Sequence, residues 1–239
     1  MKKNFFYLIN IQYLGFRYHG WQKQKDVKTV QMMVDKTLSF IFSEDIEFKT
    51  LAAGRTDSMV SALDAVFELY STHECDPDSL LVSLNLNLPA DIKALAVKET
   101  DDNFRIMNAP KSKVYSYYFC YGEKPHPFSA PFMTHIQENL DVDLMKEGAK
   151  LFLGEHYFKN YIYQPNPQKK LWRQVDHSDI SENTELTASF FPEKSYVYKI
   201  HGPGFGRHQV RLMMGQLFEL GMGKITLVDI KSCPIINLT

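Results

Sequence analysis

The residues of this chain best suited to chemistry lie in the short segment Gly54-Arg55-Thr56-Asp57. It separates the apolar run 51–53 from the strand-like run 65–70, so a turn is predicted there. Such a turn projects a carboxylate and a guanidinium from one loop. Gly and Asp are also ordinary turn residues, and Thr or Asp beside a turn often only caps backbone N–H groups. From these four residues alone, capping is the more frequent role, and the rest of the sequence has to decide.

The first half of the chain predicts a sheet that would position this loop. Aromatic and aliphatic residues over Phe5–Tyr13 predict a strand. Apolar residues at helical spacing predict a helix over Thr29–Phe42, with Thr29 as its N-cap. The remaining elements expected here are an irregular loop over 15–24, strands over 48–53, 65–71 and 92–99, and a helix over 78–86 that starts near Asp76 or Asp78.

The second half repeats this order of strand, helix and strands. The elements expected here are strands over 114–121, 172–180, 185–191 and 195–201, helices over 140–153 and 206–220, and a loop over 164–171. The order predicts an α+β protein. We expect two similar strand-helix-strand halves that form a mainly antiparallel sheet, with helices on one side and an active-site cleft between the halves. The predicted domains are residues 1–105, with the Asp57 loop, and 106–239.

Composition limits the classes of function. The chain has 239 residues, 44% of them hydrophobic and 23% charged, which suits a folded protein with a real core. The net charge is -1, from 27 Lys and Arg against 28 Asp and Glu. This balance argues against an avid, indiscriminate nucleic-acid binder, although a local basic patch can coexist with acidic surfaces elsewhere.

The cysteines and the N-terminus indicate a compartment. Cys75, Cys120 and Cys233 are far apart, which argues against a disulfide framework and a zinc site and fits a reducing environment. The apolar N-terminal run is interrupted by Asn10 and Gln12, and no small-residue cleavage site follows, so it does not predict a signal peptide. No segment is long and apolar enough to span a membrane. We expect a cytoplasmic protein.

Five segments of the chain carry recognisable motifs, and their order and spacing matter more than any one of them. They are Tyr13–Gln24, Gly54–Asp57, Leu84–Ile92, Lys113–Tyr117 and Phe205–Arg211, the last followed by Gly215. Together they resemble the motifs of the TruA-type tRNA pseudouridine synthases. The resemblance extends from Tyr7 to Gly223 and implies the pseudouridine synthase fold.

The resemblance implies a defined reaction. The family isomerises uridine in RNA to pseudouridine: the base is detached from ribose C1′ at N1, turned over and rejoined through C5. Because bonds are exchanged within one nucleotide, the reaction requires no ATP, redox cofactor or metal. We therefore expect no cofactor and no metal, which agrees with the lack of a P-loop or a Gly-x-Gly-x-x-Gly segment in the sequence.

The resemblance also implies the catalytic residues. Asp57 corresponds to the catalytic carboxylate, and whether it acts as a nucleophile at the sugar or as a base at the ribose stays open. Arg211 corresponds to the arginine that pairs with this aspartate; read alone, it is a surface charge on a helix or a partner for Glu219 or another acid. Tyr115 corresponds to the tyrosine that stacks on the target base; read alone, it is a core tyrosine on a strand.

Further residues are predicted to contact RNA. Arg55 is placed to fill the space left by a flipped nucleotide or to bind its phosphate. Arg207 lies one helical turn before Arg211, so both guanidinium groups are expected on one helix face. The complete predicted set is Gln22, Lys23, Gln24, Arg55, Lys113, Arg207 and His208. Trp21 is expected to be structural.

Two departures from the family pattern bear on the substrate. Met59 stands where the family has a glycine, and because a side chain penalises positive φ, we expect a reshaped loop. The chain also ends soon after Gly223, where relatives continue with a helix and strand. The leading interpretation is that the protein isomerises uridine in tRNA, within the anticodon stem-loop. A homodimer is the expected assembly.

The alternatives are a synthase acting on another RNA and a non-catalytic RNA-binding relative.

Overall fold

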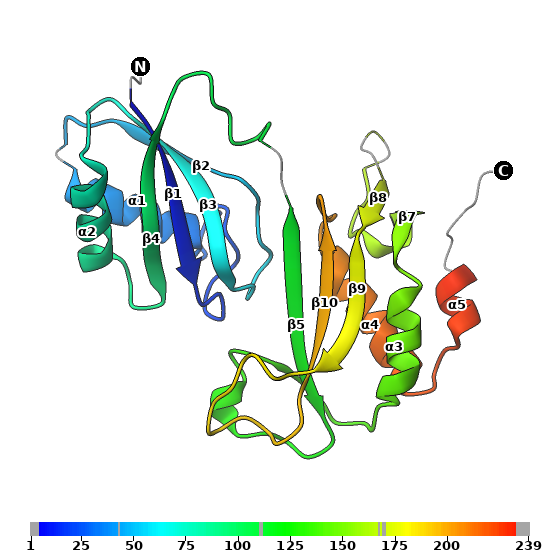
Figure 1. The fold of residues 1–239 in the computed structure, drawn as a ribbon. Coiled ribbons are helices and arrows are strands. Elements are labelled where there is room, and N and C mark those ends of the chain that lie inside the picture. Colours follow the sequence, from blue (N-terminus) through cyan, green and yellow to red (C-terminus); the bar gives the residue numbers. More distant parts are fainter. Residues whose placement is uncertain (1–4, 43, 110–111, 167, 169–170, 233–239) are drawn as a thin grey trace. The chain divides into compact units, whose positions relative to one another are not determined.

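The computed structural model describes residues 5–42, 44–109, 112–166, 168 and 171–232 (Figure 1); Cys233 lies outside them. The chain divides into two compact units, Met1–Ala109 and Pro110–Thr239. Each unit has a four-stranded sheet with helices packed on it, so the predicted α+β class with mainly antiparallel strands is confirmed. Among the described residues, no helix is long and apolar enough to cross a membrane.

The sheet of the first unit has the strand order β2-β3-β1-β4, and every neighbouring pair in it is antiparallel. Its strands are β1 (Phe5–Tyr13), β2 (Phe48–Ala52), β3 (Ala62–Ser71) and β4 (Ile92–Thr100). β2 and β4 are therefore the two edge strands. The loop with Asp57 connects the edge strand β2 to β3, as the sequence predicted.

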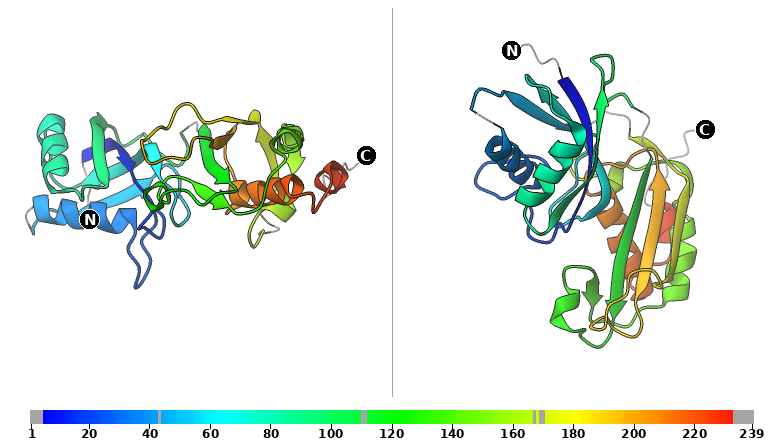
Figure 2. Two further views of the ribbon diagram at one scale, coloured as in Figure 1. Left: turned by 90° about the horizontal axis from the view of Figure 1, so that it is seen from below. Right: turned by 60° about the vertical axis from the view of Figure 1, so that its left-hand side comes forward.

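Two helices, α1 (Val30–Ile41) and α2 (Pro77–Asn87), cover one face of this sheet (Figures 1 and 2). Their buried leucines and valines share one core with alternate residues of β1 such as Ile9 and Ile11. The side chain of Thr29 accepts a hydrogen bond from the Met32 N–H, so the predicted N-cap is confirmed. α2 begins with Asp76 as its N-cap and Pro77 in its first turn.

The main sheet of the second unit has the order β6-β5-β10-β9. Its strands are β5 (Lys113–Tyr121), β6 (Thr134–Ile136), β9 (His177–Glu182) and β10 (Tyr196–Gly202). Only the short edge strand β6 pairs in parallel with its neighbour, β5. A separate two-stranded sheet joins β7 (Gly154–Tyr157) and β8 (Trp172–Val175).

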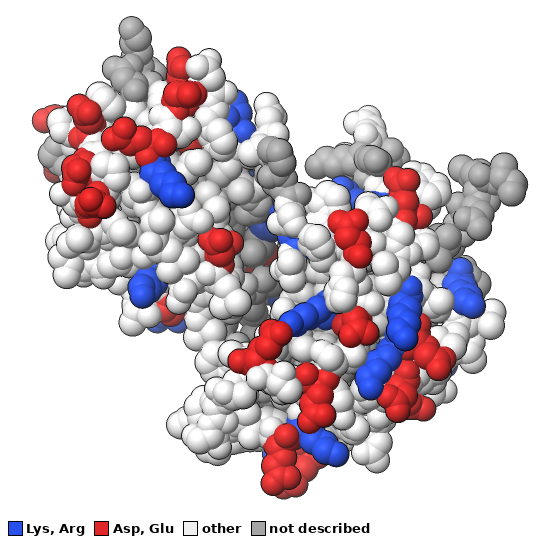
Figure 3. Space-filling view, in the orientation of Figure 1, with Lys and Arg blue, Asp and Glu red and all other residues white. Residues whose placement is uncertain are grey.

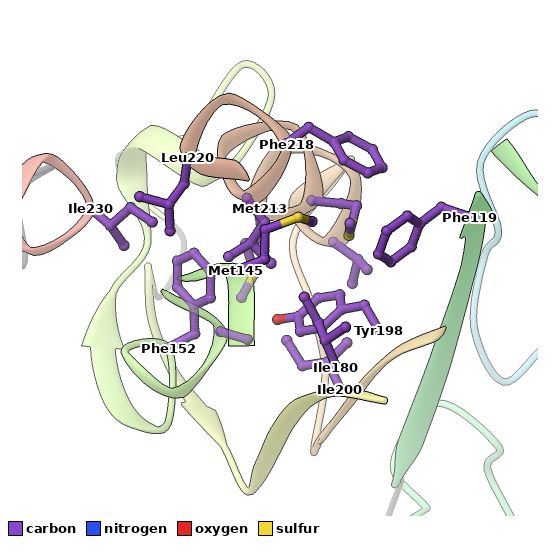
Figure 4. Packing of buried hydrophobic residues seen from close by; sticks show 14 of the residues in the cluster. Phe119, Met145, Phe152, Ile180, Tyr198, Ile200, Met213, Phe218, Leu220 and Ile230 are labelled. Carbon is purple, nitrogen blue, oxygen red and sulfur yellow. The ribbon is translucent and has the colours of Figure 1, made fainter. Parts of the chain in front are cut away.

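The core of the second unit lies between its main sheet and the helices α3 (Val142–Lys150) and α4 (Gln209–Gly221). Figure 4 shows side chains of the sheet, such as Phe119 and Tyr198, pointing toward Met145 and Met213 of the helices. A third helix, α5 (Leu227–Ser232), contributes Ile230 to the same core. The short 3-10 helices Pro127–Ser129 and Lys159–Tyr161 complete the unit.

Two predicted strands of this half are wrong in detail. The strand expected over 185–191 is a loop, because the side chain of Asn183 donates to Leu186 O (2.7 Å) and accepts from Leu186 N (3.1 Å) in place of a ladder. The strand expected over 172–180 is two strands, β8 and β9, since the chain changes its pairing partner at Asp176. β6, β7 and α5 were not predicted.

Candidate active site

The Asp57 loop is closed by backbone hydrogen bonds at its base and within its turn. Ala53 N donates to Val66 O (2.9 Å), and Val60 N donates to Asp57 O (3.3 Å). Asp57 itself is half-buried, whereas the side chain of Arg55 is exposed. The loop therefore has a defined backbone path from which the carboxylate projects.

A second loop, residues 14–21, holds the Asp57 loop from the side. Trp21 N donates to Thr56 O (3.2 Å), and Met59 N donates to Tyr18 O (2.9 Å). Trp21 is 2% exposed and its indole packs on the ring of Phe67, which confirms its predicted structural role. The backbone on both sides of Asp57 is thus tied to the first family-like motif of the chain.

Two glycines permit this close approach of the loops. A Cβ at Gly15 would lie 2.0 Å from Val60 O, and a Cβ at Gly20 would lie 2.4 Å from Thr56 O. Gly20 also has a φ of +83°, a conformation that side chains disfavour. Gly15 N donates to the Ser61 hydroxyl (2.9 Å). This hydrogen bond also ties the C-terminal end of the Asp57 loop to the loop 14–21.

Asp91, the residue directly before β4, fixes the loop 14–21. Its carboxylate accepts from the Tyr18 hydroxyl (2.7 Å) and from Arg17 Nη2 (2.8 Å), and its carbonyl accepts from Leu14 N (2.9 Å). Burial acts to raise the pKa of Asp91, but the hydrogen bonds from Arg17 and Tyr18 hold that pKa below its usual value. Burial and the hydrogen bond to Asp91 raise the pKa of Tyr18 to about 12.

This arrangement makes stability depend on pH in a defined direction. The pKa of Asp91 is lower in the folded protein than in the unfolded chain. Its contribution to the stability of the fold is therefore fully present above the unfolded pKa of about 3.9, and it is lost as pH falls through the folded pKa. At pH 7, Asp91→Asn should lower the free energy of unfolding by about 1–3 kcal/mol, measured by urea unfolding. The difference from wild type should shrink below about pH 4. Asp102→Asn, at an exposed position of the same unit, is the control; a difference independent of pH would contradict this account.

Met59 corrects one expectation. The predicted loss of the left-handed conformation at this position is wrong, since Met59 has a φ of +63° and its N–H binds Tyr18 O. Met59 is 53% exposed, so little burial compensates the backbone strain. The loop keeps a path that suits glycine while carrying methionine.

The strain at Met59 is testable. Met59→Gly should raise the free energy of unfolding by about 1 kcal/mol, because glycine adopts positive φ without the steric cost. Met59→Ala keeps a Cβ and should leave the stability nearly unchanged. Thermal unfolding of the three proteins measures both effects, and equal melting temperatures for the glycine and alanine variants would refute the strain.

The structure brings three of the predicted RNA-contacting residues to one place. Gln22, Lys23 and Arg55 line a single hollow of about 380 Å³ in the first unit. Gln24 does not line it: its amide Nε2 donates to His19 O (3.0 Å), which holds the side chain against its own loop.

In the second unit, Tyr115 lies on β5 with its ring edge-on to Phe205, at a centroid distance of 5.3 Å. Its ring is half-buried at the border of the core, on the same strand face as Tyr117. Lys113 begins the same strand. Phe205 belongs to the segment that leads into α4, so Tyr115 lies next to the start of the helix that carries Arg211.

Arg211 is exposed in the first turn of α4, but Arg207 is not on this helix. The prediction that both guanidinium groups share a helix face is wrong, because His208 has a φ of +58° and α4 begins at Gln209. The Arg207 guanidinium lies over the Tyr163 ring at 4.9 Å, and the His208 ring stacks on the same tyrosine at 5.1 Å. Arg207 and His208 are thus joined through an aromatic residue.

The predicted catalytic residues are divided between the two units: Asp57 belongs to the first, Tyr115 and Arg211 to the second. Within the described ranges, no group of three or more His, Cys, Asp or Glu residues could hold a metal ion. Sequence reasoning assigned no role to Gly15, Gly20 or Tyr163. The two glycines stand inside a quoted motif and could have been singled out, whereas nothing in the sequence marks Tyr163.

Comparison with known proteins identifies relatives for nearly the whole chain. A family model described as tRNA pseudouridine synthase matches residues 9–106 and 149–233. A protein named tRNA pseudouridine synthase A from Dictyoglomus thermophilum is 34% identical over 93% of this chain and 87% of its own length. Proteins of the same name from Thermodesulfovibrio yellowstonii and Acetivibrio thermocellus are 31% and 32% identical, over 93% and 90% of this chain and 87% and 84% of their own lengths.

Both matched segments contain parts of the site described above. The first includes the Asp57 loop and the loop that holds it, and the second includes Arg211 with the turn before α4. Tyr115 lies between the two matched segments. The extent of these matches shows that the chain belongs to the tRNA pseudouridine synthase family.

Proposed function

We propose that this protein isomerises uridine to pseudouridine in tRNA, with Asp57 as the catalytic carboxylate. The observation that carries the proposal is the Asp57 loop, whose backbone is fixed on both sides by hydrogen bonds to the loop 14–21. Catalysis of this kind depends on a carboxylate held in place before the substrate arrives. The relatives named tRNA pseudouridine synthase A support the same reaction.

The proposed reaction exchanges two bonds within one nucleotide. The N1–C1′ bond of uridine breaks, the uracil turns over, and a C5–C1′ bond forms. C5 then loses its proton and N1 gains one, so the product is an isomer of the substrate. Asp57 acts either as a nucleophile at C1′ or as a base at the ribose. Both roles need the ionised carboxylate, and a neighbouring cation favours that form.

Arg211 and Tyr115 are proposed to complete the site from the second unit. Arg211 is proposed to pair with the Asp57 carboxylate and so to stabilise its charge. Tyr115 is proposed to stack on the flipped uracil, and its hydroxyl is proposed to assist proton transfer at C5. We propose that the two units act as the N-terminal and C-terminal halves of one enzyme, with the active-site cleft between them.

The RNA contacts are proposed to come from local cationic groups, because the chain as a whole has a net charge of -1. Figure 3 shows a face of the first unit on which Asp and Glu predominate, a surface that would repel phosphates. The proposed contacts are Gln22, Lys23, Gln24, Arg55, Lys113, Arg207 and His208. We further propose the anticodon stem-loop as target, the cytoplasm as location and a homodimer as the active assembly.

Mapping of the product tests this proposal. Unmodified tRNA transcripts incubated with the protein should gain pseudouridine at defined uridines of the anticodon arm, detected by chemical labelling and primer extension. Pseudouridine only in ribosomal RNA fragments would favour the synthase of another RNA. RNA binding without any product would favour the non-catalytic relative and overturn the proposal.

A further inference from the structure

We propose that the hollow beside the Asp57 loop binds a second nucleotide of the RNA, one that neighbours the target uridine; this inference rests on the proposed function. The hollow lies in the first unit between α1, the edge strand β2 and the loop 22–23. Its volume of about 380 Å³ falls in the range of small-molecule sites. Arg55 lines it and stands two residues before Asp57, so whatever occupies the hollow lies next to the catalytic loop.

One side of the hollow is a fixed polar wall built around Gln31. Gln31 is buried, at 6% exposure. Its Oε1 accepts from Gln22 Nε2 (2.8 Å) and Lys23 N (3.0 Å), and its Nε2 donates to Thr50 O (3.2 Å) and Thr50 Oγ1 (3.1 Å). Gln31 thereby joins the loop residues Gln22 and Lys23 to Thr50 of the edge strand β2. It also fixes the side-chain amide of Gln22 at the lining of the hollow.

The charges around the hollow favour an anion. Three cationic side chains, Lys23, Lys49 and Arg55, line it together with one carboxylate, Asp35. Lys23 Nζ lies 2.5 Å from Asp35 Oδ2, so the negative charge of Asp35 is offset locally. In the described part of the chain, the exposed side chains of Lys49 and Arg55 form no ion pair or hydrogen bond, and both are available to a phosphate.

The mixture of groups fits a nucleotide better than a bare phosphate. Lys49 and Arg55 would meet the phosphate, as cations do in most protein contacts to nucleic-acid backbones. The Gln22 amide and the Asp35 carboxylate would meet a base edge, because amides and carboxylates accept from base amino groups. A flipped target leaves its neighbours unstacked, and a pocket for one of them would repay part of that cost.

The first experiment isolates Lys49, which the family-like motifs do not include. Lys49→Gln should raise the KM for tRNA about 3–10-fold and leave kcat unchanged, because the lost contact positions RNA without touching the reacting bonds. Lys98→Gln is the matched control, an exposed lysine on the other edge strand of the same sheet, β4. An equal, small effect of the two variants would overturn the proposal.

The second experiment asks for the nucleotide itself. Single abasic sites are placed in turn at each position around the modified uridine, and the affinity of the Asp57→Asn protein for each RNA is measured. One position besides the target should lose affinity about 5–20-fold, and that loss should disappear in a protein that also carries Asp35→Asn and Gln22→Ala. A penalty that is the same in both proteins at every position would refute a base site in the hollow.

Failure of this proposal can be told apart from failure of the proposed function. Suppose that the wild-type protein forms pseudouridine and that Lys49→Gln behaves like Lys98→Gln. This result would exclude the hollow as a nucleotide site and would leave the proposed reaction unaffected. A wild-type protein that forms no pseudouridine in any RNA would remove the proposed function.

Discussion

Asp57→Asn is expected to lower the single-turnover rate of pseudouridine formation by about 10⁴-fold or more, while the affinity for tRNA changes by less than about 3-fold. Asparagine keeps the shape of the side chain but carries no charge and cannot act as a nucleophile or base. The loop should keep its path, because its hydrogen bonds to Trp21 and Tyr18 come from the backbone of Thr56 and Met59. The rate is measured with enzyme in excess over tRNA, and the affinity by filter binding.

Asp64→Asn provides the matched control for this loss. Asp64 is exposed on β3, seven residues along the chain from Asp57, and within the described residues it binds only the side chain of Asn10. Its replacement should change the rate by less than about 2-fold, as expected for a surface polar group. Comparable losses of rate in Asp57→Asn and Asp64→Asn would show that the effect arises from the net charge or the stability of the first unit. The role assigned to Asp57 would then be wrong.

Gly20→Ala should have the second largest effect. The new Cβ would lie 2.4 Å from Thr56 O, a backbone atom that cannot give way without moving the Asp57 loop, and φ at this position is +83°. We expect a loss of about 2–4 kcal/mol in the free energy of unfolding. The folded fraction should show a rate lower by about 10²-fold, because displacement of a catalytic group by about 1 Å costs that much.

Gly204→Ala separates this clash from the general cost of replacing a glycine. A Cβ at Gly204 meets no atom within 4 Å, and no positive φ is required there. This variant should keep wild-type stability and rate. Circular dichroism and single-turnover kinetics on all three proteins provide the comparison. A Gly20→Ala protein with the melting temperature and rate of wild type would show that the contact between the two loops does not hold Asp57.

Sequence patterns predicted those parts of the fold that depend on local chemistry. The cap at Thr29, the strand over Phe5–Tyr13 and the turn at Asp57 were all predicted correctly, because each follows from hydrogen bonding or side-chain alternation within a few residues. Asp76 was one of two candidates for the start of its helix, and it is the cap. The family was identified from the order of five short motifs, which the comparisons confirm.

What the sequence did not predict depends on contacts between distant segments. The hydrogen bonds between the loop 14–21 and the Asp57 loop join residues that are 35 positions apart (Trp21 and Thr56) and 41 positions apart (Tyr18 and Met59), so no local pattern reveals them. The start of α4 was placed three residues early, because the left-handed backbone at His208 has no signature in side-chain periodicity. Met59 shows the converse case, in which a residue adopts a backbone angle that its own preference opposes.

The measurement that tests the central claim most directly is release of tritium from tRNA labelled at uridine C5, with wild type and Asp57→Asn in parallel. C5 loses its tritium only when the base is rejoined to ribose through that carbon. We predict stoichiometric release by wild type and none above background by Asp57→Asn at equal amounts of bound tRNA. No release by wild type, or equal release by both proteins, would contradict the account.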